Sequence, residues 1–348
     1  MTARAVTILG AGAMGSALAT PLADAGWAVN LWGTWLDDHL LAACRRGEPH
    51  PRTGVPLAGS TTLFDSPDLD DALAGADLAV LAVASAGVAE VTRRAARGLA
   101  KVRAVLLTSK GFAPDADGRI RLLPDAMRDT AAEQGVTLPP VIAVGGPCKA
   151  NEVAARRPTG AVFAARDKAL AEEIAKNFAT PAYRAEPLDD VSGVEVCAPM
   201  KNVYAIALGV CDGLAARGGE PFHDLKAATF AAAVRELVLF AELVGGGLRT
   251  AIGLAGAGDL EVTGNSGRNK IYGVRIGAGE SAAAAYAAMQ AEERTVEGVP
   301  AAGLAAKLVD QRAPQLWSEL PLFRAIRDIL AGHDDPGARI TDAVLPRV

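Results

Sequence analysis

Residues 5–32 read AVTILGAGAMGSALATPLADAGWAVNLW, and their pattern changes from strand to turn to helix and back to strand. Ala5–Leu9 is a short apolar run with β-branched residues, which is typical of a buried strand. The turn GAGAMG at residues 10–15 follows directly, and a helical pattern then runs to Gly26, which ends it. Residues 27–32 return to strand character. This order predicts a strand–helix–strand unit of a parallel sheet.

The glycine turn matches the pattern GxGxxG, which binds the pyrophosphate of a dinucleotide. Gly10 permits the tight turn, Gly12 lets the backbone approach the pyrophosphate, and Gly15 lets the helix pack closely on the strand. The helix start supplies free N–H groups and a partial positive charge for the anion. The pattern alone is weak in a chain with 37 glycines, and a simple packing turn is the alternative. The flanking strand and helix favour the dinucleotide.

Strand-like runs and Ala/Leu/Arg-rich helical stretches continue to alternate as far as residue 190. The further strand-like runs are residues 78–84, 104–109, 141–144, 161–165 and 182–184. This alternation predicts a doubly wound, mostly parallel α/β sheet of the Rossmann type, with helices on both faces. Later stretches are helical and broken by glycine: residues 194–214, 223–244, 281–293, 300–310 and 320–330. We therefore expect a dinucleotide-binding domain at residues 1–190 and an all-helical domain at residues 191–348.

Composition argues against several other classes of protein. The 348 residues carry 35 Lys and Arg against 40 Asp and Glu, so the basic balance of a non-specific nucleic-acid binder is missing. The four cysteines include no Cys-x-x-Cys pair, which indicates neither a zinc site nor a disulfide scaffold. The apolar run at residues 78–89 is too short to span a membrane, and residues 1–12 lack a signal-peptide pattern. We expect a cytoplasmic protein with no metal, no nucleic-acid partner and no membrane insertion.

The end of the second strand bears on whether the dinucleotide is NAD or NADP. An acidic residue there would accept the ribose hydroxyls of NAD, and an arginine would favour the 2′-phosphate of NADP. The strand runs into GTWL at residues 33–36, and Asp37 comes late. Thr34 can hydrogen-bond to either cofactor, and we interpret Asp37 as the cap of a solvated helix. The choice between NAD and NADP stays open.

The segment CAPMKNVYAIALGV, residues 197–210, contains a single charged residue, Lys201, in a helical pattern. An unpaired ammonium is costly to bury, so Lys201 should face a cleft or pair with an acid. Asp259, in the glycine-rich segment GAGD, is the best candidate partner. A partly desolvated lysine can have a lowered pKa and exchange a proton near neutral pH. The alternative is a surface lysine whose charge simply reaches water.

Two further segments favour a small phosphorylated substrate. Residues 263–270 read TGNSGRNK, a polar turn leading into a helical pattern, where Arg268 and Asn269 can bind a phosphate. Lys110 comes just after a predicted parallel strand, at the edge where ligands collect in open α/β sheets. Each basic residue alone would more often be solvated surface. Together with a dinucleotide turn, they indicate an anionic substrate.

On these motifs the chain resembles the NAD(P)-dependent glycerol-3-phosphate dehydrogenases. The similar segments are GAGAMGSALA (10–19), LLTSKGF (106–112), GGPCKANEVAARRPT (145–159), MKNVYAIALGVCDG (200–213), GLAGAGDLEVTGNSGRN (253–269) and RTVEGV (294–299). They run in family order over nearly the whole chain, and Gly33-Thr34 and PRTGV (51–55) look most like archaeal-type members. The resemblance implies a Rossmann domain and a helical domain related to that of 6-phosphogluconate dehydrogenase. It also implies reversible reduction of dihydroxyacetone phosphate to sn-glycerol 3-phosphate with NAD or NADP, within carbohydrate and phospholipid metabolism.

The resemblance further implies roles for individual residues. Lys201 matches the proton donor and acceptor at the C2 oxygen, Asp259 matches the acid beside it, and Lys110 matches a lysine that bridges cofactor and substrate. In ketone reduction negative charge develops on the C2 oxygen, which an ammonium stabilises. The implied substrate contacts are Lys110, Gly146, Cys148, Asn202, Thr263, Arg268 and Asn269. The implied cofactor contacts are Gly10, Gly12, Ala13, Met14, Gly15, Thr34, Lys110, Ala150, Arg268 and Glu297.

The chain also departs from the family pattern. Cys148 stands where many relatives have serine or threonine, and the polar residues that relatives carry around the lysine matched by Lys226 are missing. At those positions this chain has Leu225, Ala231 and Ala232, and Arg235, nearly one turn further, either compensates for them or is a solvated helix residue. Gly267 stands where a serine often precedes the arginine–asparagine pair. Because the missing groups would surround the substrate, another phosphorylated ketose or 2-keto compound is the alternative substrate.

A dinucleotide-binding sensor without turnover is the alternative from another class of protein. It is disfavoured because Lys201 and Asp259 are both present, and because no helix-turn-helix or basic tail is visible. The Ala- and Leu-rich helical half could also supply the face of a homodimer, although spacing alone does not separate core from interface.

Overall fold

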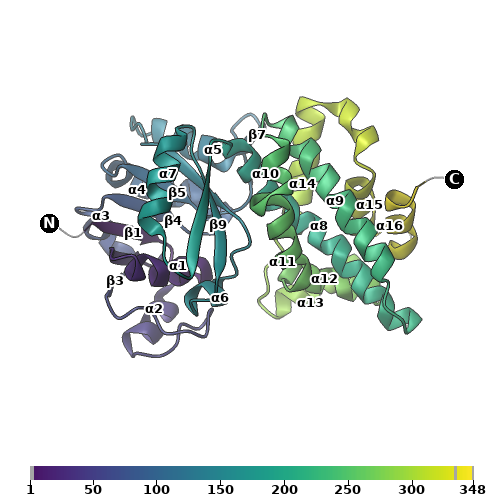
Figure 1. The fold of residues 1–348 in the computed structure, drawn as a ribbon, viewed down its shortest axis with the longest axis horizontal. Helices are drawn as coiled ribbons and strands as arrows, with labels where there is room; N and C mark the ends of the chain where they lie inside the picture. The colour runs from purple at the N-terminus through teal and green to yellow at the C-terminus, as the bar shows by residue number, and fades with distance from the viewer. Residues whose placement is uncertain (1–3, 333–334, 347–348) are drawn as a thin grey trace. The chain divides into compact units, whose positions relative to one another are not determined.

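The computed structural model describes residues 4–332 and 335–346. The chain divides into two compact units, and Figure 1 colours and labels their elements in chain order. Unit 1 comprises residues 1–113 and 121–191, and unit 2 comprises residues 114–120 and 192–348. Unit 2 thus includes a short segment from within the first half of the chain, which the sequence did not reveal.

Unit 1 is built on an eight-stranded sheet in the order β10-β9-β8-β5-β4-β1-β2-β3. Its strands are β1 (Ala5–Leu9), β2 (Ala28–Trp32), β3 (Thr61–Phe64), β4 (Leu78–Leu81), β5 (Ala104–Leu107), β8 (Val141–Gly145), β9 (Thr159–Ala164) and β10 (Tyr183–Leu188). Neighbouring strands are parallel except β8 and β9, where Val144 lies opposite Phe163. The prediction of a doubly wound, mostly parallel sheet is confirmed. Because β9 and β10 run against β8, they start at the edge where β8 ends.

Helices cover both faces of this sheet (Figure 1). One face carries α1 (Ala13–Asp24), α6 (Ala150–Ala154) and α7 (Lys168–Phe178), and the other carries α3 (Leu69–Leu73), α4 (Val88–Leu99) and α5 (Leu123–Ala132). Ile8 belongs to the first apolar core and Leu9 to the second, because successive residues of a strand face opposite sides. The remaining helical segments are α2 (Asp38–Arg45), η1 (Ser66–Asp68) and η2 (Ser85–Gly87). The predicted alternation is therefore present, with β3 as an additional strand.

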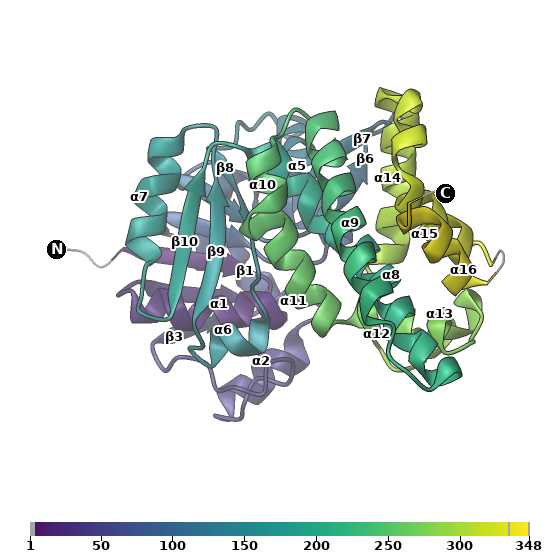
Figure 2. The same cartoon turned by 45° about the vertical axis from the view of Figure 1, so that its right-hand side comes forward.

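The described part of unit 2 is helical apart from residues 114–120, which join two short strands described below. Helix α8 forms the core of the unit (Figure 2). Its elements are α8 (Val191–Gly218), α9 (His223–Leu243), α10 (Leu248–Ile252), the π-helical turn η3 (Leu254–Gly258), α11 (Asp259–Asn265), α12 (Arg268–Gly277), α13 (Ala282–Ala291), α14 (Gly298–Arg312), η4 (Pro314–Glu319), α15 (Pro321–Leu330) and α16 (Pro336–Val344). An 18-residue window of α8 is apolar enough to cross a membrane, a point the sequence analysis overlooked. That window is entirely buried, as in the core helix of a globular protein.

Glycines let α12 lie directly against α8. A Cβ added at Gly209 would come 2.2 Å from the carbonyl oxygen of Lys270, and one added at Gly273 would come 2.0 Å from a carbonyl oxygen of α8. Gly213 and Gly277 make a second such contact one turn further along both helices. The two backbones therefore touch, and this contact fixes where the start of α12 lies relative to α8.

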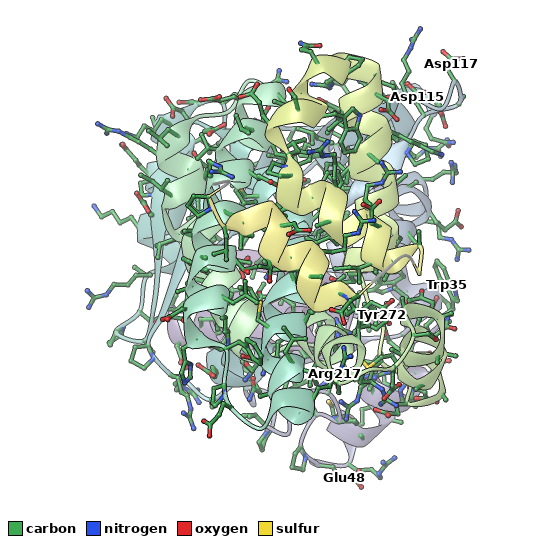
Figure 3. The ribbon with its side chains drawn as sticks, turned by 90° about the vertical axis from the view of Figure 1, so that its right-hand side faces the viewer. Trp35, Glu48, Asp115, Asp117, Arg217 and Tyr272 are labelled. Carbon is green, nitrogen blue, oxygen red and sulfur yellow. The ribbon has the colours of Figure 1, made fainter. Side chains whose placement is uncertain are left out.

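A short ribbon of β6 (Phe112–Pro114) and β7 (Ile120–Leu122) was also missed. Gln311 of α14 holds its tip, because its Oε1 accepts the N–H of Ile120 and its Nε2 donates to the carbonyl of Gly118, both over 2.9 Å. Asp115 and Asp117 lie at this tip (Figure 3), where Asp115 Oδ1 accepts the N–H groups of Asp117 and Arg119 over 3.0 and 2.9 Å. The two hydrogen bonds of Gln311 explain why the tip belongs to unit 2.

Candidate active site

Lys201 of α8 is held by two side chains of α11. Its Nζ donates to Asp259 Oδ1 over 2.5 Å and to Thr263 Oγ1 over 2.7 Å. Asp259 and Thr263 are four residues apart and so share one face of α11. Lys201 is 7% exposed and Asp259 is 1% exposed, so their attraction acts in a medium of low dielectric constant. The structure thus brings together three residues that the sequence assigned to catalysis and substrate binding.

The chain reaches Asp259 through the π-helical turn η3, which immediately precedes α11. A Cβ added at Gly256 would come 1.9 Å from the carbonyl oxygen of Ala251. Only glycine therefore allows this turn to fold back so closely on α10. The glycine-rich segment before Asp259 has a local structural purpose: it sets the point from which the carboxylate leaves the backbone.

Glu297, just before α14, accepts hydrogen bonds from two further predicted site residues. Its Oε2 accepts from Asn202 Nδ2 over 3.2 Å, and its Oε1 accepts from Arg268 Nη2 over 3.4 Å. Asn269 is buried, and its Oδ1 accepts the N–H of Gly298 over 2.8 Å. The Arg268 side chain is half exposed and remains accessible to an anion.

The glycine turn of unit 1 has the geometry that a dinucleotide requires. Gly10 has a φ of +113°, which favours glycine, and a Cβ added at Gly15 would come 2.0 Å from the carbonyl oxygen of Gly10. Among the described residues, no atom other than those of Gly12 and its chain neighbours lies within 4 Å of a Cβ added there, so the backbone is open to a ligand. Ala13 begins α1, whose first N–H groups point to the same place. The turn therefore fits the pyrophosphate of NAD or NADP.

Asp37 precedes helix α2 and also contacts the glycine turn with its side chain. Its Oδ2 accepts the N–H of Ala11 over 3.2 Å and the N–H and hydroxyl of Thr34 over 2.9 and 2.8 Å. Asp37 is the N-cap residue of α2, as the sequence indicated, but its carboxylate makes no capping hydrogen bond to that helix. Asp37 instead ties the end of β2 to the glycine turn.

His50 is a site residue that the sequence analysis missed. It is fully buried, its Nε2 lies 2.9 Å from the carbonyl oxygen of Ala11, and its Nδ1 accepts the N–H of Arg52 over 3.2 Å. Burial lowers the pKa of His50, so the ring is neutral and Nε2 carries the hydrogen that it donates to Ala11. Both peptide groups of Ala11 are thus fixed, by Asp37 and by His50. The usable signal was the segment PRTGV, which His50 directly precedes.

Several other predicted residues of unit 1 line one small hollow at the ends of β5 and β8. The lining includes Met14, Thr108, Lys110, Gly146, Cys148 and Tyr183. Gly146 has a φ of +98°, which favours glycine, and the Cys148 Sγ lies 4.0 and 3.9 Å from the carbonyl oxygens of Gly145 and Gly160. Ala150 begins α6, directly after this loop. The structure therefore groups the cofactor residue Met14 with the implied substrate residues of the loop.

The departures on α9 lie away from Lys201. Lys226 donates to Asp212 over 2.9 Å, eleven residues beyond Lys201 and so about 16 Å further along α8. Thr229 meets Cys211 over 3.4 Å, which confirms that α8 and α9 run antiparallel here. The neighbouring positions are Leu225, Ala231 and Ala232, and Arg235 is exposed. These contacts place the start of α9 beside Asp212 and Cys211 rather than beside Lys201.

Comparisons with known proteins match both units of the chain. The family model described as the N-terminus of NAD-dependent glycerol-3-phosphate dehydrogenase matches residues 5–171, and the model of the C-terminus matches residues 190–341. An NADP(+)-dependent glycerol-3-phosphate dehydrogenase of Archaeoglobus fulgidus is 36% identical over 79% of this chain and 81% of its own. A glycerol-3-phosphate dehydrogenase [NAD(P)+] of Thiobacillus denitrificans is 34% identical over 98% of both chains. The crystal structure of glycerol-3-phosphate dehydrogenase from Coxiella burnetii is similar with a TM-score of 0.82 and 28% identity over 99% of both chains.

Proposed function

Because the chain belongs to the NAD-dependent glycerol-3-phosphate dehydrogenase family, we propose that it interconverts dihydroxyacetone phosphate and sn-glycerol 3-phosphate. It is an NAD(P)-dependent oxidoreductase that acts on a CH–OH group. The observation that carries the proposal is the buried cluster of Lys201, Asp259 and Thr263, in a chain whose glycine turn fits a dinucleotide. NAD(P)H, when bound at that turn, supplies the hydride.

Lys201 moves the proton in this proposal. Its ammonium donates a hydrogen bond to the C2 carbonyl oxygen and transfers a proton as negative charge develops there. The Asp259 carboxylate pairs with the buried ammonium, and Thr263 accepts one of the ammonium hydrogens. These two fixed contacts leave the ammonium little freedom to rotate, so its donor direction is set before the substrate arrives. In the oxidation of glycerol 3-phosphate, Lys201 accepts the proton of the C2 hydroxyl.

Arg268 and Asn269 bind the phosphate in this proposal. The guanidinium of Arg268 is the group suited to a bidentate contact, and its weak 3.4 Å contact with Glu297 leaves it able to turn to a dianion. Asn269 has its Oδ1 committed to Gly298, so its Nδ2 is the end that faces an anion. Binding energy from the unreactive phosphate then helps to hold the reacting carbon in place.

A substrate panel tests the proposal. Oxidation of NADH and of NADPH is followed by absorbance with dihydroxyacetone phosphate, with other phosphorylated ketones and with unphosphorylated ketones. We expect the largest kcat/KM with dihydroxyacetone phosphate and competitive inhibition by inorganic phosphate. A larger kcat/KM with an unphosphorylated 2-keto compound would refute the assignment of the substrate. The ratio of the two cofactors' kcat/KM values answers the question of NAD against NADP.

We further propose that the enzyme works in the cytoplasm as a homodimer, without inserting into a membrane. Complete burial of the apolar window of α8 supports the absence of a membrane span, since that surface is already covered. The Ala- and Leu-rich helices of unit 2 supply apolar surface of the kind that self-association uses. Sedimentation equilibrium checks this assembly, and a single species with the mass of one chain would contradict it.

A further inference from the structure

Trp35 presents an exposed indole close to the glycine turn of unit 1. It lies three residues beyond the end of β2 and is 41% exposed, and its neighbour Leu36 is 71% exposed. Among the described residues of unit 1, these two are the large apolar side chains that remain exposed. Apolar surface left in water is unfavourable, and exposed apolar surface gathered in one place marks a binding site. The position of this surface therefore calls for a ligand.

The loop that carries Trp35 is tied to the glycine turn. Thr34 donates its N–H and its hydroxyl to Asp37 Oδ2 over 2.9 and 2.8 Å, and the same oxygen accepts the N–H of Ala11 over 3.2 Å. The hydroxyl oxygen of Thr34 also accepts the N–H of Leu36 over 3.3 Å. The backbone on both sides of Trp35 is thus fixed relative to the turn that fits the pyrophosphate.

Arg94 of α4 holds the indole from one side. Its guanidinium carbon lies 4.1 Å from the centroid of the Trp35 ring, which is a close cation–π contact. The Nε of Arg94 donates to Glu90 Oε1 over 2.7 Å, so the guanidinium is held in turn by a residue of its own helix. The indole is therefore restrained, while a large part of it stays open to solvent. A restrained ring loses little conformational entropy when a flat ligand stacks on it.

The dinucleotide has one flat group that belongs at this edge of the sheet. In a sheet of this type the ribose of the adenosine lies at the end of the second strand, where the loop of Trp35 begins. The adenine attached to that ribose is an aromatic ring system, and every base can stack on an aromatic side chain. None of the residues that the sequence analysis assigned to the cofactor is aromatic. Trp35 supplies the aromatic surface that this set lacks.

We propose that Trp35 stacks on the adenine ring of NAD(P), with Arg94 as the residue that positions the indole. The adenine lies on the open face of the indole, opposite the guanidinium. The assignment rests on the proposed function, because it takes the glycine turn to bind NAD(P). Since the contact is made to the base and not to the ribose 2′-position, it strengthens the binding of NADH and NADPH alike.

The test compares wild type with Trp35→Ala and Trp35→Phe in the full-length protein. Kd is measured by titration with NADH, with NADPH, with adenosine 5′-monophosphate, and with reduced nicotinamide mononucleotide, which has no adenine. We expect Trp35→Ala to raise Kd about tenfold for the three ligands that contain adenine and to leave Kd for reduced nicotinamide mononucleotide within about twofold of wild type. Trp35→Phe keeps an aromatic ring, so its Kd values should stay within about threefold of wild type.

Two further variants serve as controls for the stacking contact. Leu345→Ala removes an exposed apolar side chain of unit 2 and should change none of the four Kd values. Arg94→Met removes the cation from the indole, and we expect it to raise Kd for adenosine 5′-monophosphate about twofold to fivefold without changing Kd for reduced nicotinamide mononucleotide. An unchanged Kd for adenosine 5′-monophosphate in Arg94→Met would overturn the role given to Arg94.

The stacking role of Trp35 is contradicted by either of two results. An unchanged Kd for adenosine 5′-monophosphate in Trp35→Ala would overturn the inference. An equal rise in Kd for reduced nicotinamide mononucleotide would also overturn it, because the substitution would then act through the shape of the turn. The proposed function is judged separately, from turnover of dihydroxyacetone phosphate by wild type, on which these binding measurements do not depend.

Discussion

Single side chains fix the shape of the glycine turn before any dinucleotide arrives. Ala11 lies between Gly10 and Gly12, and its N–H is bound by Asp37 while its carbonyl is bound by His50. Neither partner belongs to the GxGxxG pattern. A turn whose peptide is held on both sides loses less conformational entropy when it binds a pyrophosphate, so these two residues act on cofactor affinity without touching the phosphate.

His50→Ala should weaken cofactor binding by up to about fivefold, because the carbonyl of Ala11 loses one of its two buried donors and keeps only the Ser16 hydroxyl. His50→Gln should bind the cofactor within about twofold of wild type, since its amide can still donate to Ala11. His39→Gln, at an exposed position of α2, is the control. Fluorescence titration of NADH and NADPH measures the change. Equal affinities in wild type and His50→Ala would contradict the role of His50.

The same histidine makes cofactor binding depend on pH. Burial lowers the pKa of His50 below 6.5, so the folded state holds the neutral ring and the unfolded chain binds the proton first. The stability that His50 contributes is therefore complete above pH 6.5 and is lost as the pH falls below it. We expect the cofactor affinity of wild type to fall as the pH decreases below 6.5, and the cofactor affinity of His50→Gln to change less over the same range.

At the scale of elements, the contact between α8 and α12 depends on four glycines. Gly273→Ala would place a methyl group 2.0 Å from a carbonyl oxygen of α8, so the helices must separate. We expect a loss of about 2–3 kcal/mol in the free energy of unfolding, together with reduced kcat, because Arg268 and Asn269 begin α12. Gly303 lies in α14, and among the described residues nothing outside its own helical turn and chain neighbours lies within 4 Å of a Cβ added there. Gly303→Ala should therefore raise the free energy of unfolding by about 0.5–1 kcal/mol. Equal stabilities of the two variants in urea unfolding would contradict this account.

Glu236 of α9 anchors the start of α15. Its carboxylate accepts the N–H groups of Leu322 and Phe323 over 2.7 and 2.9 Å and the hydroxyl of Tyr204 over 3.0 Å. Burial raises the pKa of Glu236 from 4.5 to about 7, despite these three donors. The folded state therefore binds the proton more tightly than the unfolded chain between these two values, and the stability contributed by Glu236 falls as the pH rises from 4.5 to about 7.

Glu236→Gln removes this titration. The difference of 2.5 between the two pKa values corresponds to about 3 kcal/mol, taken as an order of magnitude. We expect the free energy of unfolding of wild type to decrease by up to this amount more than that of Glu236→Gln across the same range of pH. Chemical unfolding at several pH values measures it. Identical pH dependence in the two proteins would show that the carboxyl does not titrate there.

For the whole molecule, the sequence predicted the fold class, the family and the chemistry, and each of these is confirmed. Local patterns sufficed for the fold class, because each strand–helix step and the glycine turn are visible within about thirty residues, whereas the family followed from motifs spread over nearly the whole chain. The ribbon of β6 and β7 was missed because its strands have three residues each, too few to show a period of two. Asp37 and His50 were missed or misread because each acts on a residue 26 or 39 positions away. Contacts between residues so far apart in the sequence depend on how the chain packs, and they produce no periodic pattern in the sequence.

The proposed mechanism is tested most directly by replacing its proton donor. Lys201→Met is compared with Lys201→Met/Asp259→Asn, which also removes the carboxylate that would otherwise be left buried without its partner. NAD(P)H-dependent reduction of dihydroxyacetone phosphate is measured together with the Kd of the cofactor. The account predicts that kcat falls by about 10²–10⁴ in both variants while cofactor Kd stays within about twofold of wild type. Turnover within about tenfold of wild type in either variant would contradict it.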